Sequence, residues 1–420
     1  MTLALFADEI ECDGSVDNVG KAANKHSHIS TSSSSLINTL PSQGWLKELA
    51  LWHLVNHSIV TWRGLITHFG HAEGAIQAHV DDWKALKLHA SHIKRFVDWH
   101  NQGVERQRFE KTMTALQRGD FHLLYEQMPE YPSLLSKITD PPPFLFYRGN
   151  VQCLHQPQLA MVGTRKPSPS ARKTAFEFAR QLAQSGIWIS SGLAQGIDAD
   201  CHRGALAAGG GRTIAVLGTG IDVCYPAAHQ PLYDQIVAEG GLVLTEFLPK
   251  TEPLAHHFPR RNRIVSGMSV GVLVVEAALK SGSLITARLA AEQGRDVLVI
   301  PGHIANEQVA GCHQLIREGA RLVTSVEDIL EDLNLSRNPL LSAEFSTTST
   351  IEADQQVSSA IPIEAHLQPL MVHLDWTGQS VDALVGSSGI DVATLSGLLM
   401  ELELSGLVTQ VNGLYQRCRV

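Results

Sequence analysis

Short apolar segments alternate with amphipathic segments through the middle of the chain. Runs such as LAMVG (159–163), IWISSG (187–192) and VGVLVVEA (270–277) are apolar at consecutive positions, and stretches with apolar residues at helical spacing separate them. Strands that are apolar on both faces are typical of a parallel sheet covered by helices on both sides. The pattern therefore predicts an α/β domain with a doubly wound parallel sheet over residues 155–335.

The pattern changes on both sides of this domain. Residues 41–115 have helical spacing throughout and predict a small helical domain, which resembles a SAM-like module. Residues 363–420 predict helix, turn, helix and a hairpin around Asn412-Gly413, an order that resembles a winged helix. Three consecutive prolines within 116–154 exclude a helix and predict an extended connector. The Ser-rich composition of 1–40 predicts a disordered tail, and the Ser/Thr/Gln-rich composition of 336–362 predicts a linker.

Composition limits the functions that this chain can have. The 420 residues carry a formal net charge of -9, which argues against a polycation that coats nucleic acid, so an anionic partner must be bound by a local patch. No apolar run approaches the ~20 residues that span a bilayer, and the acidic N-terminus is a poor signal peptide. Six scattered cysteines without a CxxC favour reduced thiols. We expect a cytoplasmic protein with no membrane partner.

Glycine, hydroxyl and basic residues are concentrated in the loops that follow the predicted strands. In such sheets, ligands bind at the carboxyl ends of the strands. Gly163-Thr164-Arg165 lies between a strand and a helix, where backbone N–H groups and an arginine can hold a phosphate. The spacing matches neither GxGxxG nor GxxxxGK[ST], so no nucleotide cofactor is predicted. Each glycine taken alone is better explained by a tight strand-to-helix turn.

The segment HHFPRRNR (256–263) concentrates cations in an acidic chain. Residues 250–300 contain seven basic and four acidic residues, an excess of three positive charges. Phe258 precedes the arginines and offers a face on which a base can stack. A solvated helix start, with arginines that pair to nearby acids, is the alternative interpretation.

Acidic residues also follow the strands, but the sequence does not favour catalysis. Asp198, Asp222, Glu246 and Glu276 would have to converge to bind a metal, and capping or ion pairing explains them more simply. Cys201-His202 and Cys312-His313 lie too far apart in sequence to form a recognisable zinc site. We therefore predict no catalytic residue, no metal and no cofactor.

Several segments, in order, resemble the DNA-processing protein DprA (Smf) family: MVGTRKPS, SGLAQGIDADCHRGAL, TIAVLGTGIDVCYPAAH, FPRRNRIVSGMS, VVEAALKSGSLITARLAAEQGRDVLVIPG and GCHQLIREGA. The resemblance implies a protein that binds single-stranded DNA, protects incoming DNA during natural transformation, loads the RecA recombinase and forms a homodimer through its Rossmann-like domain. Thr164 replaces the usual serine of the family, and His313 stands where asparagine is expected.

The resemblance and the loop positions together give a set of expected DNA- or phosphate-binding residues. These are Gly163, Thr164, Arg165, Lys166, Ser191, Gly192, Gly196, Phe258, Arg260, Arg261, Asn262, Arg263, Lys280, Ser281, Gly282 and Ser283.

Two further expectations concern an alternative activity and the C-terminal region. Nucleotide N-glycosidases of the lysine-decarboxylase-like group have a related core with a GGxGTxxE motif, but Thr286 here is followed by Ala287, Arg288 and Leu289, without the catalytic glutamate. In the C-terminal region, the second predicted helix contains acids and no Lys or Arg, which argues against binding in a major groove.

Overall fold

The computed structural model describes residues 44–333, 366–374, 378–411 and 413–417. The predicted tail (1–40) and linker (336–362) lie outside the described residues. The N-terminal region is helical, as its spacing predicts, and its helices enclose buried aromatic residues that include Trp52, Trp83 and Phe96. Its helices are α1 (Gly44–Leu54), α2 (Ile59–Phe69), α3 (Ala72–Gln77), α4 (Val80–Ala85), α5 (Ala90–His100) and α6 (Val104–Arg118).

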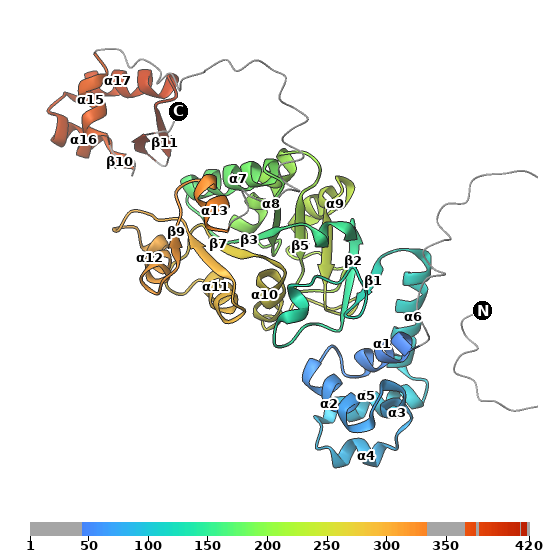
Figure 1. Ribbon diagram of the computed structural model, residues 1–420. Coiled ribbons are helices and arrows are strands. Elements are labelled where there is room, and N and C mark those ends of the chain that lie inside the picture. The colour runs from blue at the N-terminus through green and yellow to red at the C-terminus, as the bar shows by residue number, and fades with distance from the viewer. Residues whose placement is uncertain (1–43, 334–365, 375–377, 412, 418–420) are drawn as a thin grey trace, which may run out of the picture. The chain divides into compact units, whose positions relative to one another are not determined.

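A nine-stranded sheet forms the centre of the α/β domain, with strand order β1-β2-β6-β5-β4-β3-β7-β8-β9 (Figure 1). The strands from β6 to β9 in this order run parallel, and β2 joins β6 in antiparallel orientation. The predicted α/β fold class is confirmed. The strands are β1 (His122–Tyr125), β2 (Phe144–Gly149), β3 (Gln158–Val162), β4 (Trp188–Ser191), β5 (Thr213–Val216), β6 (Leu242–Thr245), β7 (Gly271–Val274), β8 (Asp296–Val299) and β9 (Arg321–Leu322).

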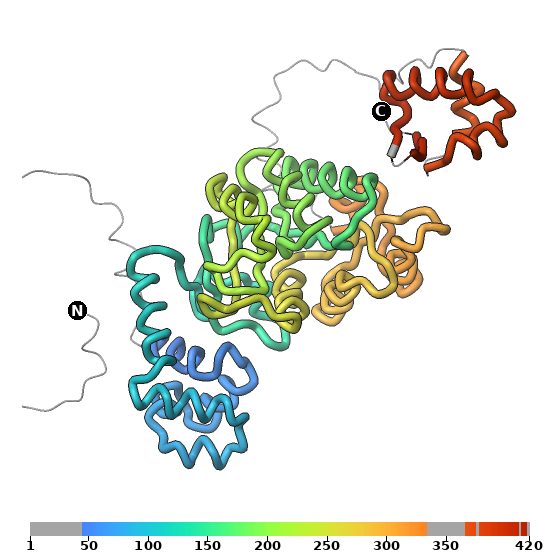
Figure 2. Tube along the Cα trace, turned by 180° about the vertical axis from the view of Figure 1, so that it is seen from behind, coloured from blue at the N-terminus to red at the C-terminus, as the bar shows by residue number. Residues whose placement is uncertain are grey.

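Helices cover both faces of the sheet, which explains why its central strands are apolar at consecutive positions (Figure 1 and Figure 2). Leu159 and Met161 of β3 pack with α7, α8 and α13, whereas Ala160 and Val162 pack with α10, α11 and α12. The helices are α7 (Pro169–Gln184), α8 (Ile197–Ala207), α9 (Gln230–Ala238), α10 (His257–Met268), α11 (Ser283–Glu292), α12 (Ala310–Arg317) and α13 (Val326–Asp332). Short 3₁₀ helices span Leu135–Lys137, Val151–His155, Ala227–His229 and Glu307–Val309.

The segment 116–154 differs from the extended connector that its prolines predict. It contributes β1 and β2 to one edge of the sheet, and the three prolines lie at the end of the connection between them, directly before β2. Proline is compatible with this position because its missing N–H and fixed φ are unfavourable only inside a ladder or helix. The prolines therefore mark the boundary between two strands of the domain.

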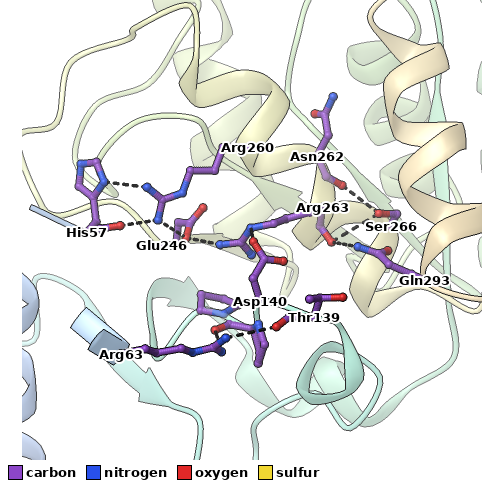
Figure 3. A network of polar contacts seen from close by, with 12 residues as sticks. His57, Arg63, Thr139, Asp140, Glu246, Arg260, Asn262, Arg263, Ser266 and Gln293 are labelled. Carbon is purple, nitrogen blue, oxygen red and sulfur yellow. Dashed lines mark hydrogen bonds and ion pairs between the residues drawn. The ribbon is translucent and has the colours of Figure 1, made fainter. Parts of the chain in front are cut away.

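The N-terminal helices contact the sheet domain through aromatic rings and two arginines. Trp52 and Trp62 lie 6.3 and 6.4 Å, centroid to centroid, from Phe144 of β2. Arg63 of α2 donates hydrogen bonds to the backbone carbonyls of Thr139 and Pro141, each at 3.2 Å (Figure 3). These contacts connect α1 and α2 to the antiparallel edge of the sheet.

The C-terminal region forms a small domain with its own apolar core, in which Leu384, Leu395 and Leu399 are buried. Its elements are α15 (Gln368–His373), β10 (Gln379–Ser380), α16 (Val381–Ser388), α17 (Val392–Leu404), β11 (Val408–Val411) and β12 (Leu414–Arg417). The strands pair in the order β10-β12-β11. Asn412, in the predicted hairpin turn, lies outside the described residues. Among the described helices, none alone has the length and apolarity to cross a membrane, and only α16 with α17, bent by 109°, pass that test as a pair.

Candidate nucleic-acid interface

The order of the strands reverses at β3, and this switch creates the candidate site. β3 pairs with β4 on one side and with β7 on the other. The chain therefore leaves β3 and β7 in opposite directions at the carboxyl edge. The loops after these two strands are joined by a hydrogen bond from the N–H of Thr164 to the carbonyl of Glu276, at 2.8 Å. A crevice outside such a switch point is the usual ligand position in this type of sheet.

Glycine is required where the loop after β3 meets the start of α8. A Cβ atom on Gly196, which has φ +83°, would lie 2.4 Å from the carbonyl oxygen of Thr164. A Cβ atom on Gly163 would lie 2.6 Å from Ile197. Both contacts are too close for a larger residue. The tight packing leaves Arg165 and Lys166 exposed at the edge of the sheet.

Arg165 lies beside a pair of aromatic rings. Its guanidinium carbon is 5.7 Å from the centroid of the Phe258 ring. The Phe258 ring also contacts Tyr225, with 5.4 Å between ring centroids. Tyr225 is 44% exposed and was not among the expected residues. Tyr225 lies in the loop after β5 and is followed by a proline. The sequence reasoning did not use this position to predict a ring at the carboxyl edge.

The loop after β4 does not form the open phosphate-binding loop that is expected from its sequence. Ser191, Gly192 and Gly196 are buried. The N–H groups of Gly192 and Ala194 donate to the carboxylate of Asp198, at 3.2 and 3.4 Å. Burial raises the pKa of Asp198, while Arg261 and these N–H groups favour its charged form. Because Asp198 already accepts from the N–H groups of Gly192 and Ala194, these two donors are not available to a ligand.

Arg261 is a correction to the predicted interface, since it lies in the interior. It is 4% exposed, and its Nη1 donates to the backbone carbonyls of Gly192 and Val216. Burial lowers the pKa of Arg261 to about 10. A Cβ atom on Gly192 would lie 2.3 Å from this guanidinium group. Arg261 therefore binds the loops after β4 and β5 together and is inaccessible to a DNA strand.

Arg260 and Arg263 also differ from the prediction, because both bind the fully buried carboxylate of Glu246 (Figure 3). Arg260 donates to Glu246 at 2.8 Å and to the carbonyl of His57 at 2.5 Å. Arg263 is 5% exposed and also contacts Asp140 at 3.0 Å. Arg263 is thus removed from the surface, whereas Arg260 is partly exposed and connects α10 to the N-terminal helices.

The remaining expected residues lie beside these arginines and at the start of α11. The side-chain oxygen of Asn262 accepts a hydrogen bond from Nε of Arg261 at 3.1 Å, which places this residue in the same polar network. Lys280 and Gly282 are exposed, and the hydroxyls of Ser281 and Ser283 lie 2.6 Å apart. The start of α11 keeps the exposed cation that a phosphate site needs.

The four acids that follow the strands each have a protein partner. Glu246 binds the arginines, Asp198 caps the loop after β4, Asp222 pairs with Lys250 at 3.0 Å, and Glu276 accepts hydrogen bonds from Ser168 at 2.6 and 3.0 Å. Within the residues that the structure describes, no group of three His, Cys, Asp or Glu side chains is arranged to hold a metal ion.

Comparison with known proteins places this geometry in a family. The family model for DNA recombination-mediator protein A matches residues 122–334, and the model for the DprA winged helix domain matches 355–413, in agreement with the predicted winged helix. Protein Smf from Escherichia coli K12 is 38% identical over 375 residues, which cover 89% of this chain and 95% of that protein. DNA processing protein DprA from Streptococcus pneumoniae R6 is 49% identical over 202 residues, 48% of this chain and 71% of that protein. An X-ray structure of DprA from Streptococcus pneumoniae aligns with a TM-score of 0.58 at 36% identity, covering 68% of this chain and 97% of that one.

Proposed function

Because this chain belongs to the family of DNA recombination-mediator protein A, also named DprA or Smf, we propose that it binds single-stranded DNA at the carboxyl edge of its sheet. The observation that carries the proposal is the group that the exposed side chains of Arg165 and Tyr225 form with the partly buried ring of Phe258 at the switch point. Single strands expose both phosphates and the flat faces of bases, and a cation next to aromatic rings binds both.

The exposed cations give the proposed path of the strand. Arg165 and Lys166 follow β3, and Lys280 precedes α11, on two loops that are hydrogen-bonded to each other. Phosphates bind along this line, and bases stack on Tyr225 and Phe258. Arg261 and Arg263 have another role in this proposal, because they fix the loops and α10 from inside. The expected ligands Gly163, Thr164, Ser281, Gly282 and Ser283 contribute backbone and hydroxyl donors.

The wider role that we propose for this protein is the one that its resemblance to the family implies. We propose that the protein acts in the cytoplasm without catalysis, protects incoming DNA, loads RecA onto it and works as a homodimer through the Rossmann-like domain. The alternative N-glycosidase activity requires an available catalytic glutamate. Glu276, in the corresponding loop, is buried and accepts a hydrogen bond from Ser168, which does not favour that activity.

The test separates phosphate contacts from base stacking. Fluorescence anisotropy of a labelled dT oligonucleotide is measured across a salt series for wild type, Arg165→Ala and Tyr225→Ala. Losing the Arg165 contact flattens the log–log salt slope by ~0.7. Losing Tyr225 weakens binding by about 1–3 kcal/mol at every salt concentration and leaves the slope unchanged. Arg118→Ala, a charge change at an exposed arginine of α6, is the matched control.

The outcomes are distinct. If wild type binds and both variants bind equally well with the same slope, the strand lies elsewhere on the protein. If wild type does not bind the oligonucleotide at moderate salt, the proposed function is wrong.

A further inference from the structure

A cavity of about 530 Å³ lies between α10 and the N-terminal helices. Its wall includes Val60 of α2, Arg95 of α5, Asp140 and the α10 residues Arg260 and Arg263. Within the described part of the chain, the residues that line it include none of the group that Arg165, Tyr225 and Phe258 form at the carboxyl edge. The cavity is therefore separate from the proposed path of the strand.

One wall of the cavity contains a buried donor without an acceptor. Nη2 of Arg263 binds Glu246, and its Nε lies 3.0 Å from Asp140. Its Nη1 has no hydrogen-bond partner among the described residues, although the side chain is more than nine-tenths buried. A buried donor left unpaired costs about 1–3 kcal/mol, so such a group indicates an acceptor that the protein itself does not supply.

A second arginine faces the same space with little compensation. Arg95 is half-buried, and its ion pair with Glu105 is long, at 3.9 Å. Burial lowers the pKa of Arg95, because its charge is removed from water without a close anion. Asp140 lines the cavity, and its carboxylate already contacts Arg263. Glu246 lies outside the lining residues and partly neutralises the charges of Arg260 and Arg263. Arg95 and Arg263 thus keep guanidinium donors without a close acceptor, and Nδ1 of His92 on the same wall also has no partner among the described residues.

The remaining wall is partly apolar and partly polar, with Ser91, His92 and His256 among its polar residues. Its size suits a small organic ligand. Val55, Ile59 and Leu289 line it together with the arginines. Cavities of roughly 300–1,000 Å³ with a few placed polar groups are typical of small-molecule sites. Guanidinium groups bind phosphate oxygens in bidentate fashion. A nucleotide combines such an oxyanion with a flat, partly apolar base.

We propose that this cavity binds the phosphate group of a nucleotide, with Arg95 and Arg263 as its donors and the base against the apolar part of the wall. The phosphate belongs either to a free nucleotide or to the end of a DNA strand; the second source rests on the proposed function.

The experiment uses the full chain and two pairs of probes. Thymidine 5′-monophosphate is compared with thymidine by calorimetry, and a 5′-phosphorylated dT oligonucleotide with its 5′-hydroxyl form by anisotropy. Arg95→Ala removes a donor, and Val60→Glu places a carboxylate at a lining position that is 85% exposed, so the fold is not disturbed. The matched controls are Arg108→Ala, an exposed arginine that pairs with the same Glu105, and Val104→Glu on α6.

We expect the 5′-phosphate to increase affinity at least fivefold in wild type and in both controls, and this gain to be lost in Arg95→Ala and Val60→Glu. A gain with the mononucleotide identifies a free nucleotide, and a gain with the oligonucleotide alone identifies a strand end. Equal affinity for phosphorylated and unphosphorylated probes in wild type overturns the proposal, as does a gain that both variants retain. Failure of wild type to bind the 5′-hydroxyl oligonucleotide would instead count against the function proposed above.

Discussion

Three arginines within four positions have different roles, set by what surrounds each of them. Arg261 and Arg263 are buried, whereas Arg260 is partly exposed and donates to the carbonyl of His57. Arg165 is exposed beside Phe258. A guanidinium group that binds backbone carbonyls from inside stabilises the fold, and one that faces water is available to a phosphate. Exposure therefore separates Arg165, which belongs to the proposed DNA interface at the carboxyl edge, from Arg261 and Arg263, which do not.

Substituting Arg261 tests this division. In Arg261→Ala the carbonyls of Gly192 and Val216 lose a buried charged donor, and a cavity replaces the guanidinium group. We expect the free energy of unfolding, measured with urea, to decrease by about 3 kcal/mol. Arg165→Ala, at an exposed position, should leave that free energy within ~0.5 kcal/mol of wild type. An Arg261→Ala protein as stable as wild type, but with a flatter salt slope for DNA, would show that Arg261 reaches the strand after all.

At the scale of elements, the close packing of α7 against α8 determines where the loops of the site lie. Gly204 of α8 faces the backbone of α7, and a Cβ atom there would lie 2.1 Å from the carbonyl oxygen of Phe176. Since α8 begins at the loop that contains Gly196, a shift of this helix moves the loops beside Arg165. Gly204 thus connects helix packing to the geometry of the interface.

Two helical glycines give opposite predictions for the same substitution. Gly204→Ala should lower the free energy of unfolding by about 1–3 kcal/mol, because the helices must separate. Gly64→Ala in α2, where a Cβ atom meets nothing within 4 Å, should raise the free energy of unfolding by about 0.5–1 kcal/mol through helix propensity. Thermal and urea unfolding of both variants measure the difference. A stabilising Gly204→Ala would show that α7 and α8 are not in close contact.

For the whole molecule, stability depends on histidines that are buried without charge. Burial lowers the pKa of His53 and His202 to about 3 and that of His57 to about 2. The unfolded chain takes up protons on these groups below pH ~6.5, whereas the folded protein does not. The free energy of unfolding therefore decreases as pH falls from about 6.5 towards 3.

The pH dependence is testable with one substitution. Between pH 7 and pH 5, each of these histidines should lower the free energy of unfolding by about 2 kcal/mol. His53 packs edge-on against Phe109, so phenylalanine is compatible with its surroundings. In His53→Phe, the loss between pH 7 and pH 5 should be smaller than in wild type by about 2 kcal/mol, measured with urea at both pH values. An unchanged pH dependence would show that His53 does take up a proton in the folded protein.

The C-terminal domain is expected to contribute little to binding of a single strand. Helix α17 contains Glu401 and Glu403 but no lysine or arginine, and Asp391 caps its start. Negative charge disfavours approach of a phosphate backbone. Deleting residues 336–420 should therefore change affinity for the dT oligonucleotide by less than tenfold, about 1.4 kcal/mol. A larger loss in anisotropy titrations would place part of the strand on this domain.

The sequence by itself determined the fold class and indicated the edge of the sheet at which we propose the site. Consecutive apolar residues with intervening helical patterns are sufficient for a covered parallel sheet, because both faces of each strand must be buried. The same order of loops pointed to Arg165 and Phe258. The alternation of strands and helices and the composition of the loops are local in sequence, so they can be predicted from patterns within a few residues.

Only the tertiary structure decided which of the arginines are buried and that β1 and β2 belong to the sheet. The backbone carbonyl and carboxylate groups that bind Arg261 and Arg263 come from residues 17 or more positions away in the sequence, namely Gly192, Val216, Glu246 and Asp140. The local sequence around an arginine is the same whether its side chain contacts water or a buried carboxylate. Burial depends on contacts between distant segments, and the pattern along the chain does not contain that information.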